Sequence, residues 1–84
     1  MLELSVVIPN HGQGDLLSAC LAALERARAS HPEAAFEVLV VDNGSRDDSV
    51  SRAHRSALGV RVIELGRNRG FAAAVNRGLA ARRG

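Results

Sequence analysis

Residues that suit polar binding chemistry gather in three short clusters of the sequence. The clusters are Pro9-Asn10-His11-Gly12, Asp42-Asn43-Gly44-Ser45 and Gly66-Arg67-Asn68-Arg69-Gly70. Carboxylate and amide side chains form several hydrogen bonds each, and glycine lets the backbone come close to a ligand. The clusters therefore suit the binding of a polar ligand, although turns alone favour the same residue types.

Each cluster follows a short apolar run, and these runs predict β-strands over residues 4–8, 36–41 and 60–65. The first two runs are nearly continuous in β-branched and aliphatic residues, as in strands that are covered on both faces. The third run alternates apolar and polar residues, which favours a place closer to the edge of the sheet.

A helical pattern follows each of these runs. The first begins at Asp15, a good N-cap, and ends before Pro32; its apolar positions are Leu16, Leu17, Cys20, Leu21 and Leu24. The second begins with a weak capping box of Ser45 and Asp48 and ends at Gly59; its apolar face holds Val50, Ala53, Ala57 and Leu58. The third places on one stripe Phe71, Ala74, Val75 and Leu79.

The resulting order β-α-β-α-β-α predicts an α/β fold: a three-layer, Rossmann-like parallel sheet formed as one domain by residues 1–84. Ligands of such sheets bind beyond the carboxyl ends of the strands. We therefore expect the loop tips around His11, Asp42 and Asn68 to meet at one rim.

The composition indicates a folded chain with little excess charge. The 84 residues are 46% hydrophobic and 24% charged, and all 11 basic residues are Arg, which gives a net charge of +2 and a pI near 10.0. Most of these arginines are spread out, and both aromatic residues, Phe36 and Phe71, fall on expected core faces, so no nucleic-acid binding is predicted. The stretch from Arg67 to Arg83 is locally basic. It is interpreted either as a solvated helix face or as a basic wall near a phosphorylated ligand.

Cys20 is the only cysteine, which excludes an intrachain disulfide and a cysteine-based zinc site. Its helical spacing predicts a small buried residue. The N-terminus carries Glu3 and no basic segment, and its apolar run ends at Pro9, so neither a signal peptide nor a transmembrane segment is predicted. The expected location is cytoplasmic.

A dinucleotide-binding domain of the NAD type is one alternative. Gly12 and Gly14 follow the first strand, and Asp42 ends the second. The third glycine of that fingerprint is missing, because Leu17 stands there, and Asp15 would repel a pyrophosphate at the helix start. A P-loop is excluded because the chain has no lysine.

Three blocks of the sequence resemble family 2 glycosyltransferases with the GT-A fold, in the order and approximate spacing of that family. They span residues 5–12 (SVVIPNHG), 40–47 (VVDNGSRD) and 68–78 (NRGFAAAVNRG), and so cover nearly the whole chain. The resemblance implies the N-terminal half of a GT-A fold. The complete enzyme would transfer a sugar from a UDP- or dTDP-sugar to a hydroxyl of a saccharide or lipid-linked acceptor, with surface polysaccharide assembly and the inner face of a membrane as its expected setting.

The resemblance also assigns a nucleotide-sugar site. The backbone near Pro9 and the ring of His11 would lie against the nucleoside, and Asp42 would accept hydrogen bonds from it. Many relatives carry an acid where this chain has Asn43, which leaves the base preference open. A loop histidine on the surface is the alternative interpretation of His11.

In the third block, Gly70 would let the helix start approach the nucleotide while Asn68 holds the loop, and Asn76 completes the motif. Asn68 could equally serve only to tie down the helix N-terminus. Arg69 and Arg77 would either neutralise the diphosphate or simply face solvent.

The resemblance places the metal-binding Asp-x-Asp motif and the general base beyond Gly84. No catalytic residue and no metal ligand is therefore predicted in this chain, and Asp47-Asp48 is expected to serve only the helix dipole. A divalent metal, Mg or Mn, is expected only in the complete enzyme. We expect a truncated domain with little or no transferase activity of its own and with an unpaired edge strand that could drive self-association. A non-catalytic nucleotide-binding module is the other alternative.

Overall fold

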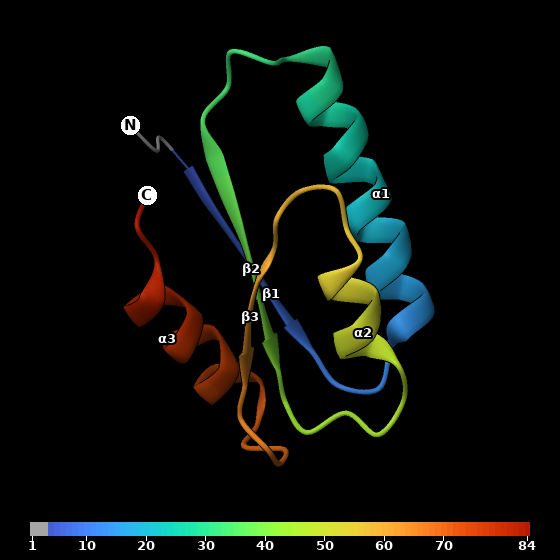
Figure 1. The fold of residues 1–84 in the computed structure, drawn as a ribbon. Coiled ribbons are helices and arrows are strands. Elements are labelled where there is room, and N and C mark those ends of the chain that lie inside the picture. The colour runs from blue at the N-terminus through green and yellow to red at the C-terminus, as the bar shows by residue number, and fades with distance from the viewer. Residues whose placement is uncertain (1–3) are drawn as a thin grey trace.

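The predicted order of strands and helices is confirmed by a computed structural model, which describes residues 4–84 (Figure 1). The elements are β1 (Leu4–Asn10), α1 (Gly14–Ser30), β2 (Phe36–Asp42), α2 (Ser49–His54), β3 (Arg61–Glu64) and α3 (Phe71–Ala81). The strands form a parallel sheet in the order β1-β2-β3. Asn10 pairs with Asp42, which pairs with Glu64, so the three strands end in one row. Glu3 lies outside the described residues.

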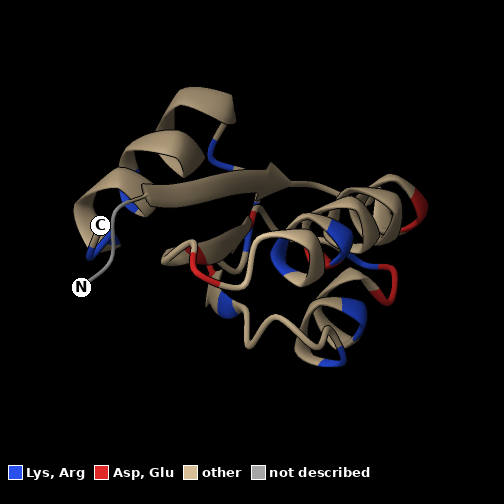
Figure 2. Cartoon of the chain, turned by 90° about the horizontal axis from the view of Figure 1, so that it is seen from above, with Lys and Arg blue, Asp and Glu red and all other residues tan. Residues whose placement is uncertain are grey.

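Helices cover both faces of the sheet and give it three layers. Figure 1 and Figure 2 show α1 and α2 on one face and α3 on the other. The core between the sheet and the first two helices is built from Leu17, Leu21, Val38, Val40, Ala53 and Leu58. Every residue of β2 after Phe36 is buried, whereas β1 is mostly half-buried because only β2 pairs with it in the described chain.

The third helix packs on the sheet through small residues. Ala74 is fully buried, and Gly78 lies so close to the sheet that a Cβ there would collide with Val7 and lie 3.1 Å from Val41 Cγ2. The predicted stripe was therefore wrong at its two ends: Phe71 is 72% exposed and Leu79 is 43% exposed. The close approach at Gly78 turns the Ala74–Gly78 side of the helix, rather than its large side chains, towards the strands.

Two expectations for the first helix were wrong. Its N-cap position is Gln13, and Asp15 lies inside the first turn, where its carboxylate binds Arg52 instead of capping the helix. Cys20 is exposed, because the buried side of α1 runs through Leu17 and Leu21, and a helix rotates about 100° from one residue to the next.

The second helix is shorter than its sequence pattern suggested. It spans six residues and ends at His54, so Ala57 and Leu58 follow it rather than continue it. Asp48 occupies the cap position without a side-chain cap bond, and Ser45 lies in the preceding loop. The predicted capping box is therefore wrong, because the Ser45 hydroxyl accepts hydrogen bonds from Asn10 Nδ2 and Gly12 N instead.

No described helix is both long and apolar enough to cross a membrane. Within residues 4–84, β1 and β3 each have one edge without a partner strand. Self-association through such an edge remains a prediction.

A carboxylate on the α3 side of the sheet carries a pH-dependent part of the stability. Glu37 is only 9% exposed and accepts hydrogen bonds from Ser5 Oγ (2.7 Å), Arg61 Nη1 (3.0 Å) and the N–H groups of Arg83 and Gly84. The Ser5 hydroxyl is the largest cause, and with the other donors it lowers the pKa of Glu37 from 4.5 to about 2, against the opposing effect of burial.

We expect the free energy of unfolding to fall as the pH drops from 4.5 towards 2. A carboxyl whose pKa is depressed by folding stabilises the native state above its unfolded pKa, and this contribution is lost as it becomes protonated. Urea titrations followed by circular dichroism at several pH values would measure the slope. Glu37→Gln should flatten it, while Glu33→Gln, at a carboxylate whose side chain is 77% exposed, should leave it unchanged. Equal slopes for Glu37→Gln and the unmodified chain would contradict the assignment.

Candidate functional site

The three loop tips meet at the carboxyl rim of the sheet, and Asn43 joins them. Its N–H donates to Asn10 O (2.8 Å) at the end of β1, and its carbonyl lies 2.8 Å from Nδ1 of His11 in the loop that follows. Its side chain accepts from Arg69 N (2.7 Å) and donates to Gly70 O (3.1 Å) in the loop before α3. Asn43 is 4% exposed, so a buried amide holds the first and third loops against the end of β2.

The contact with Asn43 fixes the ring of His11. A carbonyl oxygen can only accept, so Nδ1 carries the hydrogen and donates it. In the neutral ring, Nε2 is then left as an acceptor. The histidine is exposed, but its orientation is set by the backbone of the neighbouring loop.

A second buried polar cluster lies beneath the rim. Asn10 Nδ2 donates to Asp42 Oδ1 (3.1 Å) and to Ser45 Oγ (3.1 Å), while Ser45 N donates to Asp42 Oδ2 (2.9 Å). The Ser45 hydroxyl also accepts from Gly12 N (2.8 Å). Asp42 and Asn10 are 3% and 4% exposed. Both oxygens of Asp42 are thus engaged by protein donors, and its carboxylate ties the β1 and β2 loops together.

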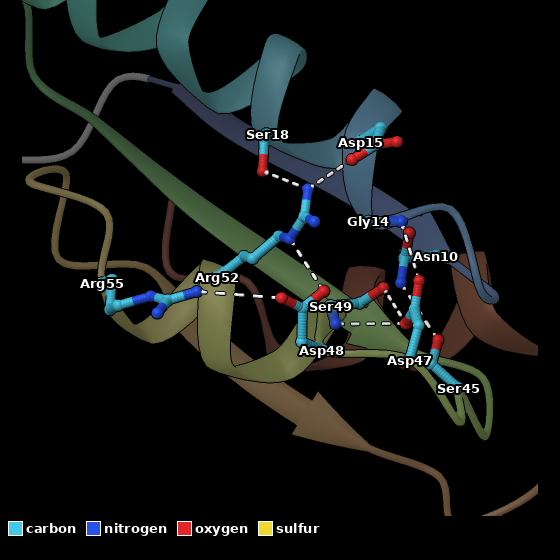
Figure 3. Close-up of polar contacts among 10 residues, drawn as sticks. All are labelled: Asn10, Gly14, Asp15, Ser18, Ser45, Asp47, Asp48, Ser49, Arg52 and Arg55. Atoms are coloured by element: carbon cyan, nitrogen blue, oxygen red, sulfur yellow. Dashed lines mark hydrogen bonds and ion pairs between the residues drawn. The ribbon is translucent and has the colours of Figure 1, made fainter.

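Asp47 connects the second loop to the start of α1, as Figure 3 shows. Its Oδ2 accepts from Gly14 N (3.0 Å), and its Oδ1 accepts from both the N–H and the hydroxyl of Ser49. The Ser49 hydroxyl is the main cause of a lowered pKa at Asp47, followed by the Gly14 N–H. The Asp47 carboxylate therefore binds the first residue of α1 and the first residue of α2. The sequence-based interpretation missed the bond to α1.

An ion-pair cluster on the outer surface links the same two helices (Figure 3). Arg52 Nη1 lies 2.7 Å from Asp15 Oδ1, and Arg52 Nε lies 2.8 Å from Asp48 Oδ1. These two acids raise the pKa of Arg52. Ion pairs with so much solvent contact contribute little to the stability of a fold, so this cluster is a minor support of the rim.

One cleft at the rim gathers several of the predicted site residues. Its walls are formed by Pro9, Asn10, His11, Gln13, Asn43, Asn68 and Phe71. Its volume of about 260 Å³ lies just below the roughly 300–1,000 Å³ of pockets for drug-sized ligands, so it suits a base or nucleoside better than a whole nucleotide sugar. Phe71 was missed as a site residue because its helical spacing assigned it to the core.

The remaining predicted site residues take different places. Asp42 lies beneath the rim, and Gly70 is held by Asn43 and by Asn68, whose Oδ1 accepts from Gly70 N (2.9 Å). Asn68 thus orders the loop before α3. Asn76 is exposed on α3, beyond the residues that line the cleft, so the structure does not bring it together with the others.

Within residues 4–84, no group of three or more His, Cys, Asp or Glu side chains could hold a metal ion. None of the chemistry proposed below is routed through a metal.

Comparison with known proteins identifies the family. The model of glycosyl transferase family 2 matches residues 5–84. The chain is 41% identical to a dolichyl-phosphate beta-glucosyltransferase of Drosophila melanogaster, over 99% of this chain and 28% of that protein. It is 33% identical to a dodecaprenyl-phosphate galacturonate synthase of Rhizobium johnstonii, over 99% of this chain and 25% of that protein.

A further relative is the undecaprenyl-phosphate 4-deoxy-4-formamido-L-arabinose transferase of Pseudomonas savastanoi pv. phaseolicola, 38% identical over 89% of this chain and 23% of that protein. The chain thus spans roughly a quarter of the length of these relatives. Because the family model matches nearly every described residue, the chain belongs to glycosyl transferase family 2.

Proposed function

We propose that this chain is the nucleotide-binding, N-terminal half of a GT-A fold and that its rim cleft binds the nucleoside of a UDP- or dTDP-sugar. The observation that carries the proposal is the cleft between His11, Asn43, Asn68 and Phe71, which lies where ligands of parallel α/β sheets bind. Family membership supports the same assignment.

The walls of the cleft suit a nucleobase. The exposed ring of Phe71 offers an apolar face, and the ring of His11, fixed by Asn43 O, offers a second flat surface with one free nitrogen. Stacking on aromatic rings discriminates little between bases. Any preference for one base must therefore come from the polar groups that line the cleft. Because the Asn43 amide already binds Arg69 N and Gly70 O, we expect it to hold the loop rather than to select the base.

For the complete protein we propose transfer of the sugar to a polyprenyl phosphate. The relatives named above carry dolichyl, dodecaprenyl or undecaprenyl phosphate in their names, which favours a lipid phosphate over the acceptor hydroxyl suggested by sequence alone. An oxygen of the acceptor phosphate would attack the anomeric carbon, and the bond from that carbon to the nucleoside diphosphate would break. We place this reaction at the inner, cytoplasmic face of a membrane. Surface polysaccharide assembly remains a prediction.

The NAD-type alternative is disfavoured by the start of α1. The N–H of Gly14 is bound by the carboxylate of Asp47, and Asp15 lies in the same helical turn. Two acids at this terminus would repel the pyrophosphate of a dinucleotide.

Phe71→Ala is the sharpest test of the nucleoside cleft. Because base–aromatic stacking contributes about 1–3 kcal/mol, we expect the affinity for UDP to fall by about 5-fold to 150-fold. Leu79→Ala removes another exposed apolar side chain from the same helix and is the matched control, with affinity unchanged. Isothermal titration calorimetry with UDP, dTDP and NAD would measure the effects. Equal losses for both variants, or tight binding of NAD, would refute the proposal.

A further inference from the structure

The charge of the chain is divided unevenly along the sequence. Residues 65–84 hold five arginines and no acid, whereas residues 1–64 hold six arginines and all nine acids. The final segment therefore carries a formal charge of +5 and the rest of the chain −3, although the whole chain is only +2. A charge asymmetry of this kind points to an anionic partner such as a membrane or a nucleic acid.

The fold gathers the basic segment in one layer. α3 by itself covers one face of the sheet, and Figure 2 shows no acidic residue on it. We call residues 67–84 the α3 layer; its arginines are Arg67, Arg69, Arg77, Arg82 and Arg83. All five are exposed, and among residues 4–84 none of them takes part in an ion pair. On the opposite face, by contrast, Arg52 and Arg55 are paired with acids.

The acids on this side of the sheet leave most of that positive charge in place. Glu37 is only 9% exposed, and its oxygens are already bound by Ser5, Arg61 and the N–H groups of Arg83 and Gly84. Glu64, the last acid of the chain, is exposed at the end of β3 and offsets one charge at most. The field in front of the α3 layer is therefore positive.

Apolar side chains are exposed on the same layer. Leu79 is 43% exposed, and Ala72 and Ala80 are exposed with it on the side of α3 that faces away from Ala74 and Gly78. A helix with this combination binds a membrane surface, because its apolar side chains enter the headgroup region while long arginine side chains reach the lipid phosphates.

A nucleic acid fits the α3 layer less well. Binding to single strands relies on aromatic side chains that stack on the bases. Phe71 is the aromatic side chain of this layer, and it lines the nucleoside cleft. The charge and the exposed Leu79 together favour a lipid surface.

We propose that the α3 layer binds the surface of a membrane that contains anionic lipid, with its arginines against the lipid phosphates and Leu79 among the headgroups. The choice of a lipid surface rests in part on the proposed function, because a polyprenyl phosphate resides in a membrane. Phe71 begins α3 and lines the nucleoside cleft, so a chain bound through this layer holds its donor site next to the membrane.

Co-sedimentation with vesicles tests the proposal, using phosphatidylcholine alone and phosphatidylcholine mixed with phosphatidylserine. We expect the chain to bind the mixed vesicles and to bind them less tightly as salt is added, since salt screens the attraction. Each arginine near an anionic surface strengthens binding about 5-fold, so Arg77→Gln/Arg82→Gln should weaken it by about 30-fold. Leu79→Ala should weaken it as well.

Arg26→Gln/Arg55→Gln is the matched control. It removes the same charge from exposed positions on α1 and at the end of α2, on the opposite face, and should leave vesicle binding unchanged. Equal losses in the two double variants would overturn the inference, because the net charge and not the α3 layer would then attract the vesicles. Failure of the unmodified chain to bind the mixed vesicles would overturn it too, as would tighter binding to a single-stranded DNA oligonucleotide.

The vesicle assay contains no nucleotide, so its result is separate from that of the nucleoside proposal. A chain that binds UDP but no vesicles would retain the nucleoside cleft and lose the membrane surface. A chain that binds mixed vesicles through Arg77 and Arg82 but does not bind UDP would retain the membrane surface alone.

Discussion

Gly44→Ala is expected to lower the free energy of unfolding by about 3 kcal/mol and to weaken UDP binding. Gly44 has φ +79°, and a Cβ there would lie 2.6 Å from Arg67 Cα and 2.9 Å from Asn68 N. A left-handed conformation costs a residue with a side chain roughly 1–2 kcal/mol, and overpacking against atoms that cannot move freely costs about 1–3 kcal/mol more. Because the obstacle is backbone, the loop carrying Arg67 and Asn68 must shift, which changes the nucleoside cleft.

Gly59→Ala separates these two costs. Gly59 has φ +68° but no atom within 4 Å of an added Cβ, so only the conformational strain of roughly 1–2 kcal/mol should appear. Urea denaturation followed by circular dichroism would give both stabilities, and calorimetry with UDP would show whether binding changes at position 44 alone. If Gly44→Ala were no less stable than Gly59→Ala, the loop of Gly44 and the loop of Arg67 would not be in close contact.

Asp42→Ala should destabilise the fold by about 3 kcal/mol. It removes the acceptor of Ser45 N and one of the two acceptors of the Asn10 amide, and an unpaired buried donor costs about 1–3 kcal/mol, more where a charged partner is lost. Asp42→Asn keeps the shape but must turn an N–H towards one of these donors, so an intermediate loss is expected.

Asp15→Ala is the control for Asp42, because it deletes a carboxylate that is 98% exposed and bound to Arg52 at the surface, where a change of no more than roughly 1 kcal/mol is expected. Urea titrations would give the free energy of unfolding of Asp42→Ala, Asp42→Asn and Asp15→Ala and so rank the three variants. If Asp42→Ala retained full stability yet lost UDP affinity, Asp42 would contact the nucleoside, as the family resemblance implies, and would not be the tie between loops that its hydrogen bonds indicate.

The order of elements could be predicted because each strand and helix carries a local signal. The aliphatic run at residues 36–41 is too continuous for a strand with a solvated face, and β2 is indeed buried throughout after Phe36. The polar clusters after the strands were also predicted to meet, since parallel strands end on one side of a sheet. The ends of the helices were harder to predict. The sequence pattern placed Leu58 on the second helix, but α2 ends at His54 and Leu58 packs in the core from the loop that follows.

The sequence by itself determined the alternation of strands and helices, the family resemblance and the rim on which the polar residues lie, because periodicity and turn residues act locally along the chain. Only the tertiary structure decided which side of α3 is buried and which residues line the nucleoside cleft. Helical spacing proposed Phe71 for the core, but the contact of Gly78 with Val7 and Val41 turned Phe71 out to the rim. Likewise, the bonds of Asn43 to Arg69 and Gly70 join residues that are remote in sequence, and no local pattern encodes such contacts.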